Sequence, residues 1–94
     1  MLLPARLIVD VSLMRCEILL FAHLREAIGT DRLSIDLPEG ATVQDAVEAL
    51  AKQHEIIALM GSRIAAAVDE QYRPRSSPLR DGCTIALIPP VSGG

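Results

Sequence analysis

The end of the sequence carries the residues best suited to chemistry. The chain closes on Pro89-Pro90-Val91-Ser92-Gly93-Gly94, so a proline pair is followed after two residues by a glycine pair. Proline fixes φ and favours polyproline II, so we expect the tail to leave the domain stiffly. Glycine has no β-carbon, which lets its backbone enter a narrow channel in another protein. The pattern predicts a tail that presents the α-carboxylate of Gly94 to a partner.

The α-carboxylate of Gly94 is a poor acyl donor because it is an anion. Its attack on the α-phosphorus of ATP would give an acyl-adenylate, from which a sulfur donor could displace AMP. The product is a C-terminal thiocarboxylate, whose sulfur is a better nucleophile than oxygen. The sequence contains no GxxxxGK[ST] phosphate loop, so a partner must handle the ATP. We expect no permanently bound cofactor, only transient AMP and thiocarboxylate at the C terminus.

The other reactive side chains predict no catalytic or metal centre. His23 and His54 are isolated, without neighbouring cysteines or carboxylates in the spacing of a triad or a metal site. Cys16 is interpreted as a small core residue. Cys83 follows a predicted turn and is expected to be partly exposed, with a role in sulfur relay as the alternative. Two cysteines do not suggest a disulfide framework.

Composition excludes several classes of protein. The 94 residues, half of them hydrophobic, fit one small folded domain. The net charge of −3 and the two aromatic residues, Phe21 and Tyr72, provide no basic or stacking surface for nucleic acid. No uncharged run approaches the roughly 20 residues of a membrane span. We therefore expect a cytoplasmic protein without nucleic-acid or membrane partners.

The elements that position the tail follow from apolar periodicity and turn residues. The main helix is predicted at Val43–His54, because Thr42 and Asp45 form a near-capping box ahead of an apolar face. The first strand is expected to be buried on both faces, and the fourth, interrupted by Pro74, to be short or at an edge. Strands are expected at Cys16–Ala22, Leu33–Leu37, Ile64–Val68, Tyr72–Ser77 and Thr84–Ile88, a short helix at His23–Ile28, and a further helical turn at Ile56–Met60.

This order predicts an α+β fold of the β-grasp type, a mixed sheet with one main helix packed across it. The first and last strands are the most apolar and should be parallel neighbours in the sheet centre. A ferredoxin-like fold is the alternative, but only Ile56–Met60 could supply its second long helix. Residues 14–94 are expected to form the domain. Residues 1–13 are expected to be an extension without the pattern of a signal peptide, or else to add an edge strand at Leu7–Val11.

Ordered motifs from Met14 to Gly94 resemble those of the MoaD family, the small subunit of molybdopterin synthase, in the MoaD/ThiS ubiquitin-like superfamily. Asp69 departs from the pattern, since the family usually has Asn there. The motifs are Phe21-Ala22-His23-Leu24-Arg25-Glu26 with Gly29 (F-A-x-x-R-E-x-x-G), Thr42-Val43, Ala66-Ala67-Val68, Pro78-Leu79, Asp81-Gly82 and Ile88-Pro89-Pro90-Val91-Ser92-Gly93-Gly94.

The resemblance implies a sulfur carrier. In the family an E1-like adenylyltransferase (MoeB-like) adenylates the terminal glycine, here Gly94, which becomes a thiocarboxylate. The tail then enters the large synthase subunit (MoaE-like) and donates sulfur to cyclic pyranopterin monophosphate, in two deliveries that build the dithiolene. Catalytic side chains lie in the large subunit, so the carrier is a co-substrate more than an enzyme. The implied assembly is a heterotetramer.

The partner contact is expected at the base of the tail. Phe21 and Ile88 would form its apolar centre if both face outwards, with Tyr72 at its border and Arg25 in a polar rim. The alternatives place Phe21 in the core and Arg25 on a solvated helix. The remaining contacts are expected from the tail itself, Pro89, Pro90, Val91 and Ser92, with Gly93 and Gly94 as the reactive end.

Two other functions compete with this interpretation. One is a related carrier for thiamine thiazole or for cysteine synthesis, although the thiazole carriers are generally shorter and lack the proline pair. The other is a ubiquitin-like interaction module in which Gly93 and Gly94 are an inactive tail.

Overall fold

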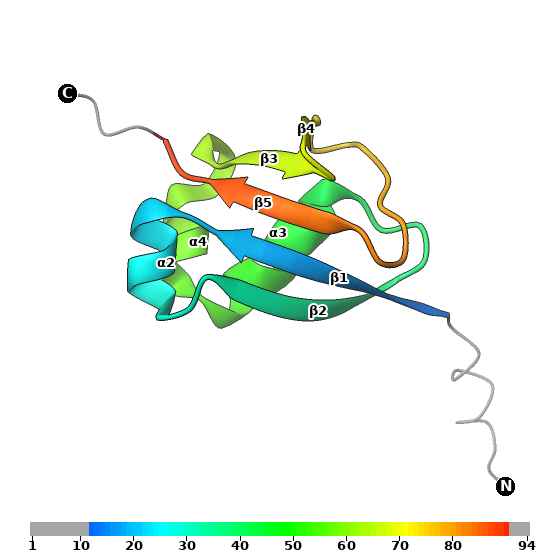
Figure 1. Ribbon diagram of the computed structural model, residues 1–94, viewed down its shortest axis with the longest axis horizontal. Helices are drawn as coiled ribbons and strands as arrows, with labels where there is room; N and C mark the ends of the chain where they lie inside the picture. Colours follow the sequence, from blue (N-terminus) through cyan, green and yellow to red (C-terminus); the bar gives the residue numbers. More distant parts are fainter. Residues whose placement is uncertain (1–11, 91–94) are drawn as a thin grey trace, which may run out of the picture.

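The computed structural model describes residues 12–90 and confirms the β-grasp prediction (Figure 1). A five-stranded mixed sheet packs against helices on one of its faces. The strands are β1 (Leu13–Leu20), β2 (Arg32–Pro38), β3 (Ala65–Val68), β4 (Gln71–Tyr72) and β5 (Thr84–Ile88), and the helices are α2 (Ala22–Ile28), α3 (Val43–Gln53), α4 (Glu55–Met60) and the 3₁₀ turn η1 (Gly61–Arg63).

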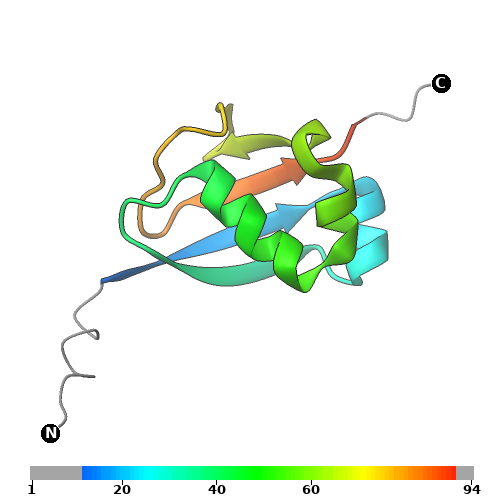
Figure 2. The same cartoon turned by 180° about the vertical axis from the view of Figure 1, so that it is seen from behind.

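The sheet has the strand order β2-β1-β5-β3-β4. Strands β1 and β5 are parallel, with Glu17 opposite Thr84 and Leu20 opposite Leu87, and all other pairs are antiparallel. The first and last strands are therefore neighbours in the sheet centre, as predicted. Figure 2, which views the molecule from behind, shows α3 crossing in front of the sheet, so the face seen in Figure 1 carries no helices.

Strand β1 corrects one prediction. It is buried on one face only: Cys16, Ile18 and Leu20 are at most 1% exposed, whereas Leu19 between them is partly exposed. The expectation of burial on both faces is wrong, because the helices cover a single face of the sheet. The strand also begins and ends earlier than predicted, since Ala22 already belongs to α2.

Helix α3 follows its sequence signals closely. The hydroxyl of Thr42 accepts a hydrogen bond from the Asp45 backbone N–H at 3.3 Å, and the Thr42 N–H donates to the Asp45 carboxylate at 2.9 Å. This reciprocal pair is the predicted capping box. Val43, Val47 and Leu50 are at most 4% exposed and pack in the core beneath the sheet, as expected.

The segment between β4 and β5 is held by backbone hydrogen bonds, such as Val43 N–H to the Ser77 carbonyl at 3.0 Å and Leu79 N–H to the Ala41 carbonyl at 2.9 Å, and by the side chain of Arg75. Strand β4 has only two residues, and the expected strand over Tyr72–Ser77 is otherwise irregular. Arg75 donates to the Gln44 side-chain oxygen at 2.7 Å and to the carbonyls of Gly61 and Ile64, each at 2.9 Å. Arg75 thus ties this segment to α3 and η1. The periodicity of the sequence did not predict that Arg75 makes these contacts.

Candidate functional site

The described part of the tail begins at the end of β5. Pro89, directly after Ile88, is buried, so the chain leaves the body of the domain only after this residue. Gly93 and Gly94, which are predicted to be reactive, and the predicted partner contacts Val91 and Ser92 lie outside the described residues. Within the described residues, the candidate site is the surface that surrounds Pro89 and Pro90.

The helix-free face of the sheet is apolar near this point. Leu19 lies opposite Ala86, Ala86 opposite Ala67, and Ala67 opposite Tyr72, so one row of side chains crosses β1, β5, β3 and β4. Strand alternation places this row on the face away from Ile18 and Ile85, which are buried against the helices. Six apolar residues on this face are called the open-face patch: Leu19, Phe21, Ala67, Tyr72, Ala86 and Ile88.

Phe21 is at the centre of the predicted contact. It is the N-cap residue of α2, with an extended backbone, and its carbonyl accepts the Leu24 N–H at 3.0 Å. The side chain is 45% exposed, and because Leu20 lies opposite Leu87, Phe21 is level with Ile88 at the end of β5. Tyr72 is 71% exposed on the same face. The structure thus places Phe21 beside Ile88, with Tyr72 on the same face but two strands away from Ile88.

Charged residues flank Phe21 on two sides. One hollow beside it is lined by Arg25 of α2 with Asp31 and Arg32, and another is bordered by Asp69 and Glu70 of the β3–β4 turn. Arg25 is exposed, as its predicted place in a polar rim requires. Leu19, Ala67 and Ala86 were not among the predicted site residues. Their positions follow from strand register, which individual motifs do not report.

Charged and polar side chains of β1 and β2 cover the open face beside the open-face patch. Arg15 and Asp36 form a two-pronged ion pair at 3.0 and 3.2 Å, and Arg32 and Ser34 each donate to Glu17 at 2.9 Å. The guanidinium of Arg15 lowers the pKa of the Asp36 carboxyl through a hydrogen bond. These charged residues thus separate the open-face patch from the exposed Leu13, which lies opposite Pro38 at the other end of the sheet.

Cys83 corrects a second prediction. It is 4% exposed rather than partly exposed, and its sulfur lies 3.3 Å from that of the fully buried Cys16. The two cysteines directly precede the parallel register pair Glu17–Thr84, which places both on the core side of neighbouring strands. The sequence separation of 67 residues concealed this contact.

No group of three or more potential metal ligands occurs among residues 12–90. His23 is exposed on α2, and His54 lies at the junction of α3 and α4. Within the same residues, no helix is long and apolar enough to cross a membrane.

Comparison with known proteins agrees with this geometry. The model of the ThiS family matches residues 18–94. The molybdopterin synthase sulfur carrier subunit of Arabidopsis thaliana is 32% identical over 85 residues, covering 90% of this chain and 88% of the relative. The molybdopterin synthase sulfur carrier subunit of Escherichia coli K12 is 35% identical over 82 residues, which cover 83% of this chain and 98% of the relative.

A solved structure from Pyrococcus furiosus, described as a candidate subunit 1 of the molybdopterin converting factor, superposes with a TM-score of 0.76. It is 31% identical and covers 83% of this chain and 99% of its own. The chain therefore belongs to the ThiS family, and its resemblance to the molybdopterin synthase sulfur carrier subunits of that family is confirmed.

Proposed function

We propose that this chain carries sulfur as a thiocarboxylate on Gly94 and delivers it as the small subunit of a molybdopterin synthase. One observation carries the proposal: the apolar part of the helix-free face lies where β5 leads into Pro89 and Pro90. A partner that binds this patch is placed to receive the residues that follow. The proposal locates the carrier and its partners in the cytoplasm.

Loading requires activation of the Gly94 carboxylate. One carboxylate oxygen attacks the α-phosphorus of ATP and expels pyrophosphate, which gives the acyl-adenylate. A sulfur donor then attacks the acyl carbon and displaces AMP, leaving the thiocarboxylate. We assign ATP binding to an E1-like (MoeB-like) enzyme, because the sequence has no phosphate loop. Nucleotide is thus a transient substrate at the C terminus and not a resident cofactor.

Delivery requires a large subunit (MoaE-like) that covers the open-face patch. Phe21 and Ile88 provide adjacent apolar anchors, and Arg25 lies at their polar margin. Buried Pro89 fixes where the tail starts. The four residues beyond Pro90 span at most about 14 Å when extended, at about 3.5 Å each. The acceptor, cyclic pyranopterin monophosphate, must therefore bind within this distance of Pro90.

The test is intact mass after incubation with ATP, the E1-like enzyme and a sulfur source. Wild-type protein should exchange one terminal oxygen for sulfur. Deletion of Gly94, or addition of one residue after it, should abolish this exchange, because a displacement of about 1 Å already disturbs near-attack geometry. Gly93→Ala should be loaded more slowly, since its β-carbon would meet the channel wall.

Both length variants leave residues 12–90 unchanged and should melt at the wild-type temperature. Loading of the Gly94 deletion at the wild-type rate would refute the carrier chemistry. Growth of a strain lacking molybdopterin, restored by this chain, separates the proposal from a carrier for thiazole or cysteine synthesis.

A further inference from the structure

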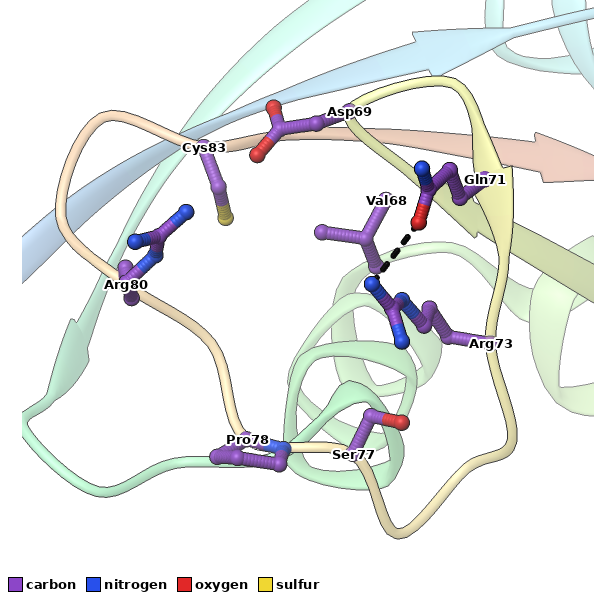
Figure 3. Close-up of a pocket in the computed structure, with 8 residues that line it drawn as sticks. All are labelled: Val68, Asp69, Gln71, Arg73, Ser77, Pro78, Arg80 and Cys83. Carbon is purple, nitrogen blue, oxygen red and sulfur yellow. Dashed lines mark hydrogen bonds between the residues drawn. The ribbon is translucent and has the colours of Figure 1, made fainter.

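A second pocket lies at the end of β5 opposite the tail (Figure 3). Its volume is about 480 Å³, and its walls come from the β3–β4 hairpin and the segment that leads into β5. The thiol of Cys83 lines this pocket. Figure 3 shows the guanidinium groups of Arg73 and Arg80 approaching from opposite sides. The proposed sulfur-carrier function uses none of these groups.

Cys83, which is 4% exposed, is the member of the cysteine pair that lines this pocket. The Cys83 sulfur contacts that of Cys16 at 3.3 Å, and Cys16 has no exposed surface. Both thiols are free. Burial raises the pKa of the Cys16 thiol to about 12, so this thiol is almost entirely protonated at neutral pH. A reagent in solution would therefore meet Cys83 first and Cys16 only through it.

The charges around the pocket favour an anionic reagent. Two arginines line it against one carboxylate, Asp69, although the whole chain has a net charge of −3. Asp69 accepts the Thr84 backbone N–H at 3.0 Å, and Arg73 donates to the Gln71 side chain at 2.8 Å. Arg73 and Arg80 belong to neither ion pair found among residues 12–90. A positive pocket raises the local concentration of anions.

We propose that this pocket admits a small anionic disulfide, R–S–S–R, which oxidises Cys83 and Cys16 to an intramolecular disulfide. The Cys83 thiolate attacks one reagent sulfur, forms Cys83–S–S–R and expels RS⁻, which takes up the proton released by Cys83. The Cys16 sulfur, giving up its proton, then attacks the Cys83 sulfur and expels the second RS⁻, which is protonated in turn. Two protein thiols are oxidised, one reagent disulfide is reduced to two RSH, and no other reactant is needed.

The backbone favours the second step. The Glu17 N–H donates to the Cys83 carbonyl at 3.0 Å, so the two cysteines are held side by side at the start of the parallel pair. With the sulfurs already in contact, bond formation needs side-chain rotation and a small shift. The bond would join positions 67 residues apart, and a closed loop of this length restricts the unfolded chain. The tail, at the other end of β5, stays free for sulfur transfer.

The experiment uses the reduced full-length chain with an unmodified Gly94 carboxylate. It is incubated separately with glutathione disulfide (anionic), bis(2-hydroxyethyl) disulfide (neutral) and cystamine (cationic). We expect loss of about 2 Da, two hydrogen atoms, and a peptide linking Cys16 to Cys83 under non-reducing digestion. Relative to the reagents' rates with a small model thiol, the anionic reagent should react about 10-fold faster than the cationic one. The oxidised form should melt about 5 °C or more above the reduced form.

Variants identify the role of each group. Cys16→Ala should stop at the mixed disulfide on Cys83, and Cys83→Ala should remain unmodified. The double variant Arg73→Gln/Arg80→Gln should remove the preference for the anionic reagent, whereas Lys52→Gln, an exposed charge on α3, should retain it.

Three results would overturn the proposal. The first is a wild-type chain without the Cys16–Cys83 peptide after treatment with glutathione disulfide. The second is modification of Cys16 in Cys83→Ala at the rate at which the wild-type chain reacts. The third is a preference for the anionic reagent that persists in Arg73→Gln/Arg80→Gln. Peptide mapping of the wild type needs no variant to fold, so the first result is decisive by itself.

Discussion

Replacing Phe21 by alanine should weaken binding to the large subunit without unfolding the carrier. A phenylalanine presents about 200 Å² of surface, and 45% exposure leaves roughly 90 Å² for a partner to cover. At about 25 cal/mol per Å², this area corresponds to about 2 kcal/mol. The dissociation constant of Phe21→Ala should therefore rise about thirtyfold.

Isothermal titration of the large subunit with each carrier variant measures this effect. Leu59→Ala is the matched control, because Leu59 is 66% exposed but lies on α4, on the opposite side of the sheet from the open-face patch. Its dissociation constant should equal that of the wild type. A change of less than threefold for Phe21→Ala, in protein that melts cooperatively, would remove Phe21 from the interface. Equal weakening by Leu59→Ala would refute the choice of face.

Three further variants test the fold that supports the site. Leu50→Ala should cost about 3 kcal/mol, because Leu50 is 1% exposed, and an unchanged urea midpoint would contradict its place in the core. Arg75→Met should lower the free energy of unfolding by about 2 kcal/mol, because it removes three hydrogen bonds, and Arg75→Lys should restore part of this stability. A melting temperature of Arg75→Met equal to that of the wild type would show that these bonds contribute nothing. Deletion of residues 1–11 keeps all of β1 and should leave sulfur loading and melting unchanged, whereas a molten product would make that segment part of the fold.

Local patterns in the sequence predicted the order of the elements and the β-grasp fold. The Thr42–Asp45 capping box and the apolar face of Val43, Val47 and Leu50 predicted α3, because helix periodicity and capping depend on residues a few positions apart. The apolar character of the first and last strands likewise predicted their central parallel pairing. The proline and glycine pairs predicted a reactive end at Gly94 without any tertiary contact.

The wrong prediction for β1 arises from the same apolar residues that form part of the open-face patch. Leu19 and Phe21 are apolar, so the strand has the composition of one buried on both faces. In the structure the helices cover the other face, and these two residues belong to the open-face patch. An apolar residue on the uncovered face of a sheet is indistinguishable in sequence from one in the core.

Tertiary structure alone decided the contacts between distant segments. The Cys16–Cys83 contact depends on the register of β1 with β5, and the three acceptors of Arg75 lie on segments up to 31 residues away in the chain. Periodicity within a segment reports which of its side chains share a face. It does not report which neighbour covers that face or at what register, because these depend on how all the elements pack together.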